Sequence, residues 1–156
     1  ITADCPLLDP VVGDAVIASF IEGRWDYLSN TLNPTFPDGL DVEAFTFAAL
    51  EKAFHEAKKA SEREHVTPYI WSRPEIFKIS HYLHSENLSG LRWTVDTEPD
   101  FKFVDEIYKN LYPSHKMFLM EDILRLLKEK PGIAKINTGQ TRNEGYAKSL
   151  AKENCL

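Results

Sequence analysis

Residues 91–111 read LRWTVDTEPDFKFVDEIYKNL, an apolar segment followed by a polar turn and a helical pattern. Residues 91–95 predict a short strand, because aromatic and β-branched side chains favour extended backbone. Thr97 predicts the N-cap of a helix, and Asp100 stands at the position where an acidic side chain closes a capping box. A strand that leads directly into an amphipathic helix is typical of α/β folds.

Two aspartates follow apolar segments that we expect to be strands. Asp96 follows the strand at 91–95, and Asp4 follows residues 1–3 at the start of the chain. Ligands of open α/β sheets bind outside the carboxyl ends of strands, so both positions favour a binding site. Two carboxylates can share one Mg²⁺ and leave room for phosphate oxygens. The alternative is that each aspartate only stabilises a turn or caps a helix.

The rest of the chain alternates between helical and extended patterns. Asp9-Pro10 predicts the start of a helix that ends at Gly23, and Thr46 predicts the N-cap of another. The expected helices are 10–23, 47–64, 97–111 and 120–128, and the expected strands are 1–3, 25–29, 42–45, 76–79 and 91–95. This alternation predicts an α/β sandwich.

Composition narrows the class of protein. The chain has 156 residues, 43% hydrophobic and 27% charged, which fits one globular domain. Its net charge of −6 is divided into −9 over residues 1–115 and +3 over the rest, and so acidic a surface disfavours nucleic-acid binding. The sequence contains no apolar run long enough to predict a membrane-spanning helix. Two cysteines without a CxxC pair argue against structural zinc and favour a reducing, cytoplasmic location.

Five segments occur in an order that resembles one enzyme family. They are ITADCPLL at 1–8, FPDGLDVE at 36–43, REHVTPYI at 63–70, RWTVDT at 92–97 followed by Asp100-Phe101, and RNEGY at 142–146. Together they resemble the sugar cytidylyltransferases, in particular the spore-coat polysaccharide biosynthesis subgroup related to acylneuraminate and KDO cytidylyltransferases.

The resemblance implies a fold, an activity and a metal site. The fold is a three-layer α/β sandwich of the nucleotide-diphospho-sugar transferase, Rossmann-like type. The activity is transfer of CMP from CTP to a sugar or sugar acid, with release of pyrophosphate, in surface polysaccharide synthesis. Carried over by position, Asp4 and Asp96 are the catalytic residues and the ligands of Mg²⁺.

Further polar residues in these segments are candidates for substrate binding. Asp41 and Glu43 face the same way if their segment is extended, and can accept hydrogen bonds from sugar hydroxyls. His65 can bind substrate, and Arg63 and Arg73 can meet a substrate carboxylate in a fork. Each residue also has a structural alternative. Asp41 and Glu43 can be exposed carboxylates on a strand, and His65 can simply end a helix. Arg63 and Arg73 can pair with surface acids.

The chain also departs from the family pattern. Glu98 precedes Pro99, whereas the family commonly places proline directly after the Asp-Thr pair, so we expect a slightly altered helix entry. No basic, glycine-containing phosphate loop occurs in the sequence. We therefore expect residues 1–156 to be the carboxyl-terminal two thirds of a single nucleotidyltransferase-like domain that lacks its nucleotide-binding part and is inactive and unstable alone.

Two regions and two other functions complete the sequence-based hypotheses. Residues 25–79 are a candidate dimerisation or substrate subregion, which predicts a homodimer. Residues 137–156 form a polar tail. Arg142 in this tail can, like the other arginines, either meet a substrate carboxylate or pair with a surface acid. One alternative function is a non-catalytic, sugar-binding or oligomerisation partner of a full-length enzyme. The other is a nucleotidyltransferase that uses another base or an alditol phosphate acceptor.

Overall fold

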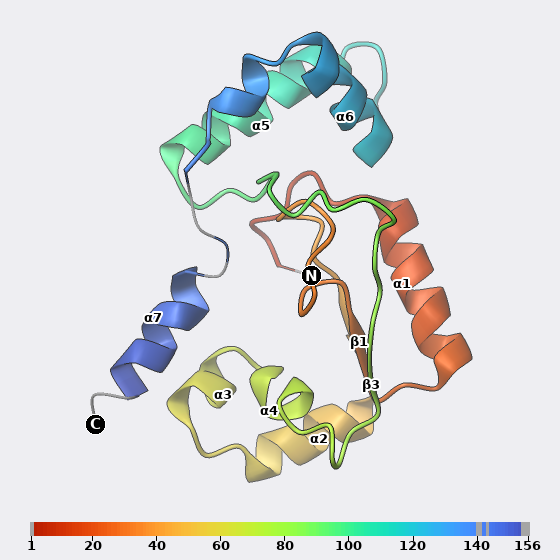
Figure 1. The fold of residues 1–156 in the computed structure, drawn as a ribbon, viewed down its shortest axis with the longest axis vertical. Helices are drawn as coiled ribbons and strands as arrows, with labels where there is room; N and C mark the ends of the chain where they lie inside the picture. Colours follow the sequence, from red (N-terminus) through yellow and green to blue (C-terminus); the bar gives the residue numbers. More distant parts are fainter. Residues whose placement is uncertain (1, 140–141, 143, 154–156) are drawn as a thin grey trace.

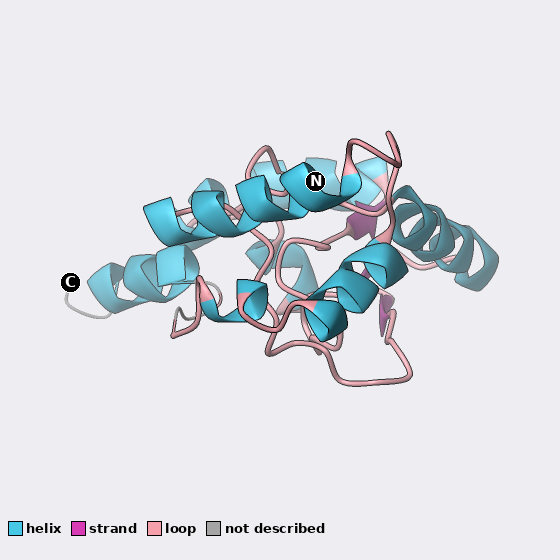
Figure 2. Cartoon of the chain, turned by 90° about the horizontal axis from the view of Figure 1, so that it is seen from above, coloured by secondary structure: helices cyan, strands magenta, loops and turns pink. Residues whose placement is uncertain are grey.

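The computed structural model describes residues 2–139, 142 and 144–153. Within them, a three-stranded sheet is formed by β1 (Tyr27–Ser29), β2 (Glu43–Phe45) and β3 (Ile79–His81), in the order β2-β1-β3. β1 is antiparallel to β2 and parallel to β3. Strands make up only a small part of the described chain, and most of it is helix and loop (Figure 2).

Helices lie around this sheet and extend beyond it. They are α1 (Pro10–Gly23), α2 (Phe47–Glu56), α3 (Ala60–Glu64), α4 (Pro68–Trp71), α5 (Glu98–Leu111), α6 (Met120–Glu129), the 3-10 helix η1 (Ile133–Lys135) and α7 (Glu144–Glu153). α5 and α6 lie at one end of the molecule, and α2, α3 and α4 lie at the other (Figure 1). No helix in the described part of the chain is long and apolar enough to span a membrane.

Helices cover both faces of the sheet. Tyr27 and Leu28 of β1 are fully buried, and successive side chains of a strand point to opposite faces. Tyr27 packs with Ala49 of α2 and Ile70 of α4, whereas Leu28 packs with Val16 of α1. The predicted mixed α/β class is therefore confirmed, and the finer assignment to a three-layer, Rossmann-like type stays a prediction.

The largest apolar core lies between α5, α6 and the loop segments at 36–42 and 91–95. Its centre is formed by Trp93, Phe103, Ile107 and Ile123, each at most 1% exposed. Trp93 belongs to the segment at 91–95, for which the sequence predicts a strand. Its burial fixes the backbone of that segment against α5, because close-packed interiors resist displacement.

An aspartate takes part in each of two predicted helix starts, those of α1 and α5. The N-cap Thr97 of α5 donates its backbone N–H to Asp100 at 3.0 Å, and the Thr97 hydroxyl accepts from the Asp100 N–H, so the capping box is confirmed. Asp9 caps α1 by accepting from the N–H of Val11 at 2.7 Å. The second oxygen of Asp9 accepts from the N–H of Met120 at 2.8 Å, which ties the start of α1 to the start of α6.

The expected strand at 91–95 is extended but is no strand in the structure. Its only ladder pair within the described residues is a parallel bridge between Arg92 and Asp38. Further along, the N–H of Val95 donates to the carbonyl oxygen of Asp4 at 2.9 Å. The segment therefore forms hydrogen bonds with two different loops in turn. It is not a strand, because a continuous β-ladder needs one partner segment over several residues.

Three other boundaries differ from the sequence-based expectation. Asp4 lies in a turn and residue 1 lies outside the described residues, so the strand expected at 1–3 is not observed. The helix expected at 47–64 is divided into α2 and α3, because Ala57 is extended with φ −65° and ψ 127°. β3 begins at Ile79, because a turn in which the N–H of Phe77 donates to the carbonyl of Arg73 occupies the preceding residues.

Candidate active site: a carboxylate cluster bridged by two arginines

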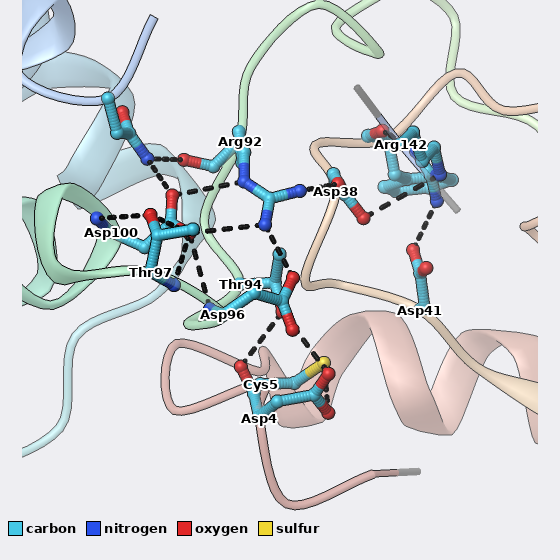
Figure 3. A network of polar contacts seen from close by, with 12 residues as sticks. Asp4, Cys5, Asp38, Asp41, Arg92, Thr94, Asp96, Thr97, Asp100 and Arg142 are labelled. Carbon is cyan, nitrogen blue, oxygen red and sulfur yellow. Dashed lines mark hydrogen bonds and ion pairs between the residues drawn. The ribbon is translucent and has the colours of Figure 1, made fainter. Parts of the chain in front are cut away.

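Three segments bring acidic side chains together beside the start of α5 (Figure 3). They are residues 4–5, 36–42 and 92–100, and they are joined by backbone hydrogen bonds from Trp93 to Asp38 and from Val95 to Asp4. We call the following side chains the carboxylate cluster: Asp4, Asp38, Asp41, Asp96 and Asp100. Two arginines, Arg92 and Arg142, lie among them.

A glycine allows the loop at 36–42 to approach the segment at 92–96. Gly39 has φ +109°, a backbone conformation that side chains with a Cβ rarely adopt. A Cβ placed there would lie 2.6 Å from the backbone N of Thr94 and 2.6 Å from the backbone C of Trp93. The close approach of the two backbones therefore requires glycine at this position.

A buried asparagine fixes the other side of the same loop. Asn30 follows β1 and is fully buried. Its Nδ2 donates to the carbonyl of Leu40 at 2.7 Å, and its Oδ1 accepts from the N–H of Val42 at 2.8 Å. Asp41 lies between these two bonded residues, so the Asn30 amide sets the position of the Asp41 carboxylate.

Arg92 joins three carboxylates. Its guanidinium donates to Asp38 and to Asp100 at 3.0 Å each, and also to Asp96. Asp100 is fully buried, and it also accepts from Asn137 Nδ2 at 3.0 Å. Burial opposes the ionisation of Asp100, but hydrogen bonds from Arg92, Asn137 and the N-cap threonine outweigh it and hold its pKa below the ordinary value.

Arg142 approaches the cluster from the opposite side. It donates to Asp41 through Nη2 and to the carbonyl of Phe36 at 3.3 Å, and its Nε lies 3.7 Å from Asp38 Oδ1. Burial raises the pKa of Asp41 to about 6, and the attraction of Arg142 opposes that rise. Asp41 therefore changes its charge close to neutral pH.

Asp4 is oriented by its neighbours Thr94 and Cys5. The Thr94 hydroxyl donates to the backbone carbonyl of Asp4 at 3.0 Å and lies 3.4 Å from its Oδ2. The Cys5 thiol lies 3.8 Å from Asp4 Oδ1. Burial raises the pKa of Cys5, and the nearby Asp4, Asp41 and Asp38 carboxylates raise it further. Cys5 is therefore a neutral thiol near pH 7, which is neither a nucleophile nor a good metal ligand.

The donor set fits Mg²⁺ only with help from a substrate. Among the described residues, no group of three or more His, Cys, Asp or Glu side chains could hold a metal ion. Asp4 and Asp96 nevertheless supply the hard oxygen donors that Mg²⁺ prefers, and Mg²⁺ commonly binds one or two carboxylates together with substrate phosphates. Asp96 is 55% exposed, so an ion can reach it, although Arg92 already bonds one of its oxygens.

Comparison with known proteins shows what this chain is similar to. No protein-family model matches the chain. It is 38% identical over 151 residues to an uncharacterized protein, MJ1063, of Methanocaldococcus jannaschii, with 94% of this chain and 58% of that protein covered. It also superimposes on a cytidylyltransferase from Leptospira borgpetersenii with a TM-score of 0.82 and 31% identity, over 90% of this chain and 59% of that one. The fold is cytidylyltransferase-like.

The overlap with these proteins is partial. The chain spans less than two thirds of the length of both proteins. The match agrees with the family predicted from the sequence at the level of cytidylyltransferases. The spore-coat subgroup stays a prediction.

The predicted substrate residues Asp41 and Glu43 have different hydrogen-bond partners. Asp41 belongs to the carboxylate cluster, whereas Glu43 lies on β2 and accepts hydrogen bonds from the hydroxyls of Tyr27 and Thr67. The Thr67 bond is 2.8 Å long, and Tyr27 is fully buried. Glu43 thus links β1, β2 and the start of α4, and a role of Glu43 in substrate binding stays a prediction.

The other three predicted residues contact helices. Arg63 donates to the carbonyl of Phe54 at the end of α2 at 3.3 Å, and Arg73 pairs with the buried Glu62 at 2.7 Å. His65 lies 3.0 Å from the Ser149 hydroxyl of α7. His65 ends α3, as its structural alternative predicts, whereas neither arginine pairs with a surface acid in these contacts. Substrate binding by Arg63, His65 and Arg73 stays a prediction.

Sequence reasoning missed the residues that hold the cluster together. Asp100 was identified only as a helix cap, and Asp38 and Arg92 only as members of family-like segments. The available signal was the occurrence of Arg92, Asp96 and Asp100 at intervals of four residues beside a predicted N-cap. With this spacing, the Arg92 guanidinium can reach both Asp96 and Asp100 only if the backbone turns at the N-cap. The sequence pattern alone does not show whether it turns there.

Proposed function

We propose that the protein transfers CMP from CTP to a sugar or sugar acid and releases pyrophosphate. The observation that carries this proposal is the likeness to a cytidylyltransferase, at a TM-score of 0.82 and 31% identity. The position of Asp4 and Asp96 in one carboxylate cluster supports it. We place the reaction in surface polysaccharide synthesis in the cytoplasm, in keeping with the spore-coat resemblance of the sequence.

The reaction is a displacement at phosphorus. The acceptor hydroxyl oxygen forms a bond to the α-phosphorus of CTP, the bond from that phosphorus to the bridging oxygen breaks, and pyrophosphate leaves. The hydroxyl proton passes to solvent. The protein contributes position and charge stabilisation, as is usual in phosphoryl and nucleotidyl transfer.

The residues of the cluster have distinct roles in this proposal. Asp4 and Asp96 would hold Mg²⁺, which when bound offsets the charge of the phosphate oxygens. Arg92 orients Asp96 through their ion pair, and the buried Asp100 in turn orients Arg92. Asp41 is the carboxylate we assign to the acceptor hydroxyls, because a carboxylate can accept from two hydroxyls at once.

The test is an assay of Mg²⁺-dependent pyrophosphate release by the full-length protein. CTP and a panel of sugar acids are the substrates, and ATP, GTP and UTP are tested beside CTP. Asp4→Ala and Asp96→Ala should each lower turnover at least about 100-fold, because each removes a charged ligand. Asp14→Ala is the matched control, because Asp14 is exposed on α1.

Each result decides between the functions. Turnover with CTP that depends on both aspartates supports the proposal, and equal turnover with all four nucleotides contradicts the cytidine assignment. Folded protein without turnover contradicts the enzyme and favours a non-catalytic partner.

We also propose a homodimer formed through α2. Phe47 and Phe54 are seven residues apart on this helix and are 76% and 65% exposed, so they form one apolar face within residues 25–79. Ultracentrifugation of wild type and Phe47→Ser/Phe54→Ser tests this. A dimer that dissociates in the double variant is expected, and a wild-type monomer at all concentrations contradicts it.

A further inference from the structure

A buried asparagine outside the carboxylate cluster holds Arg92 at two points. Asn137 lies just after η1 and is buried. Its Nδ2 donates to the backbone carbonyl of Arg92 at 2.9 Å and to Asp100 Oδ1 at 3.0 Å. An asparagine amide nitrogen carries two donor hydrogens, so these bonds use both of them. One side chain therefore bonds the backbone of Arg92 and also a carboxylate that the Arg92 guanidinium bonds.

Asn137, Arg92 and Asp100 form a closed ring of hydrogen bonds. Arg92 Nε donates at 3.0 Å to the same Asp100 oxygen that accepts from Asn137. The other Asp100 oxygen accepts from Arg92 Nη2 at 3.1 Å and from the backbone N–H of Thr97 at 3.0 Å. An arginine side chain has many rotamers, and bonds to both its backbone and its guanidinium restrict them. The ring thus fixes the direction of the guanidinium.

The ring directs the remaining guanidinium hydrogens toward two other members of the carboxylate cluster (Figure 3). Nη2 of Arg92 bonds Asp96, and Nη1 bonds Asp38 at 3.0 Å. The side chain of Asp96 is 55% exposed, so water competes for its carboxylate. An ion pair between two freely moving side chains at the surface contributes little. The pair can therefore orient Asp96 only because Arg92 is itself held from the inside.

The apolar core holds Asn137 in turn. Ile133 of η1 belongs to the core around α5 and α6, and Ile136 packs against it. Because Asn137 directly follows Ile136, close packing of these two side chains fixes its backbone. Asn137 also lines a cavity of about 110 Å³ together with Arg92 and Trp93. Truncation of the asparagine would enlarge this cavity, and a small polar solute could then enter it.

We infer that Asn137 is a positioning residue, which holds the Arg92 guanidinium against Asp96. It acts by bonding the backbone of Arg92 and the carboxylate of Asp100 at the same time. Asp96 is thereby kept in one orientation before nucleotide and metal bind. The inference rests on the proposed function in taking Asp96 as a Mg²⁺ ligand. It extends the site to a residue beyond α6 that acts only through other side chains.

Two measurements on the full-length protein test this inference. The first is hydrogen exchange of the Arg92 Nε–H, followed by nitrogen-15 NMR without nucleotide or metal. Asn137→Ala should accelerate this exchange at least about tenfold, because hydrogen bonds to the Arg92 backbone and to its charged partner are lost. The second is affinity for the Mn²⁺–CTP complex, measured by electron paramagnetic resonance. Asn137→Ala should lower it about 10- to 100-fold, as is typical when a residue that orients a metal ligand is removed.

Asn110→Ala is the matched control. It makes the same substitution on α5, where Asn110 Nδ2 donates to the carbonyl of Glu106 at 2.7 Å. The control should leave both the exchange of the Arg92 Nε–H and the affinity for Mn²⁺–CTP unchanged.

Chemical rescue separates positioning from a general loss of stability. Formamide carries the NH₂ group that Asn137→Ala removes, and the cavity beside this position can admit it. It should restore both slow exchange of the Arg92 Nε–H and affinity for Mn²⁺–CTP, whereas N,N-dimethylformamide, which has no N–H, should restore neither. If Asn137→Ala does not fold, Asn137→Ser takes its place. A serine hydroxyl has a single donor hydrogen and cannot serve both acceptors, so smaller losses of the same kind are expected.

Unchanged exchange of the Arg92 Nε–H in the folded variant overturns the inference. So does an affinity for Mn²⁺–CTP that is lost in Asp96→Ala but unchanged in the Asn137 variant. A failure of the proposed function looks different, because Asp96→Ala itself would then leave the affinity for Mn²⁺–CTP unchanged. Since the exchange is measured without nucleotide or metal, the two failures are distinguishable.

Discussion

Arg92 donates hydrogen bonds from both Nε and Nη2 to the two oxygens of Asp100, at 3.0 and 3.1 Å. Asp100 has no exposed surface, and the same oxygen that meets Nη2 also caps the first turn of α5. The negative charge beside the positive end of the helix dipole is therefore shared between the helix and the guanidinium. The start of α5 and the orientation of Arg92 depend on one buried carboxylate.

Asp100→Asn should lower the free energy of unfolding by about 3–5 kcal/mol, because it leaves the guanidinium of Arg92 without its buried partner. Urea denaturation at pH 7 measures the change. Asp105→Asn is the matched control, because Asp105 pairs with Lys109 on the solvent side of α5, where the two side chains are 44% and 59% exposed. The control should leave the urea midpoint unchanged. A loss below about 1 kcal/mol in Asp100→Asn would show that the pair stabilises little.

The same pair predicts a pH dependence with a definite sign. The pKa of Asp100 is lower in the folded protein than its unfolded value of about 3.9. The folded state therefore binds fewer protons, and the stabilisation is present above pH 4 and is lost as the pH falls through the folded pKa. The difference in stability between wild type and Asp100→Asn should thus shrink in acid. A difference that stays constant from pH 7 to pH 2 would contradict this.

Gly39→Ala tests the approach of the two loops. The variant must adopt φ +109° and place a Cβ 2.6 Å from backbone atoms of Trp93 and Thr94. Strain of this kind costs about 1–3 kcal/mol, and the clash adds to it. Gly90→Ala is the control, because nothing lies within 4 Å of a Cβ at that position. Thermal unfolding should show a lower midpoint for Gly39→Ala alone, and equal midpoints would contradict the argument.

Asp41 should titrate near neutral pH. Carbon-13 NMR of the aspartate side chains should give Asp41 a midpoint of about 6, because burial raises its pKa. Arg142→Gln should raise that midpoint, since the guanidinium opposes the effect of burial. The folded state holds this proton more tightly than the unfolded chain, so the contribution of Asp41 to stability is present below pH 4 and is lost as the pH rises through about 6. A midpoint near 4 would contradict the burial of this carboxylate.

Local patterns predicted the starts of α1 and α5 but not the division of 47–64 into α2 and α3. Asp9-Pro10 and Thr97 with Asp100 mark helix starts by chemistry that acts within one turn, and α1 and α5 begin where these residues predict. The sequence also predicts an extended segment at 91–95, but its partners are loops at residues 4 and 38. Those contacts join distant parts of the chain, and the local periodicity of apolar residues does not predict them.

The carboxylate cluster shows the same limit. Asp4, Asp41 and Asp96 were predicted as site residues and do lie together, whereas Arg142 was left open between two roles. Its contact with Asp41 spans 101 residues. The tail at 137–156 was expected to be a polar segment, and within its described residues α7 instead contacts α3 through His65 and Ser61.

His65→Ala tests the docking of α7 onto the region of α3. The substitution removes the 3.0 Å hydrogen bond to Ser149 and the edge-on contact with Tyr146, while the Ser61–Glu153 bonds remain. Hydrogen exchange should therefore become faster in α7 and stay unchanged in α5, because local opening depends on local contacts. His115→Ala is the control, since His115 is exposed between α5 and α6. Adding Ser61→Ala should accelerate exchange in α7 further. Unchanged exchange in the double variant would mean that α7 is held by other contacts.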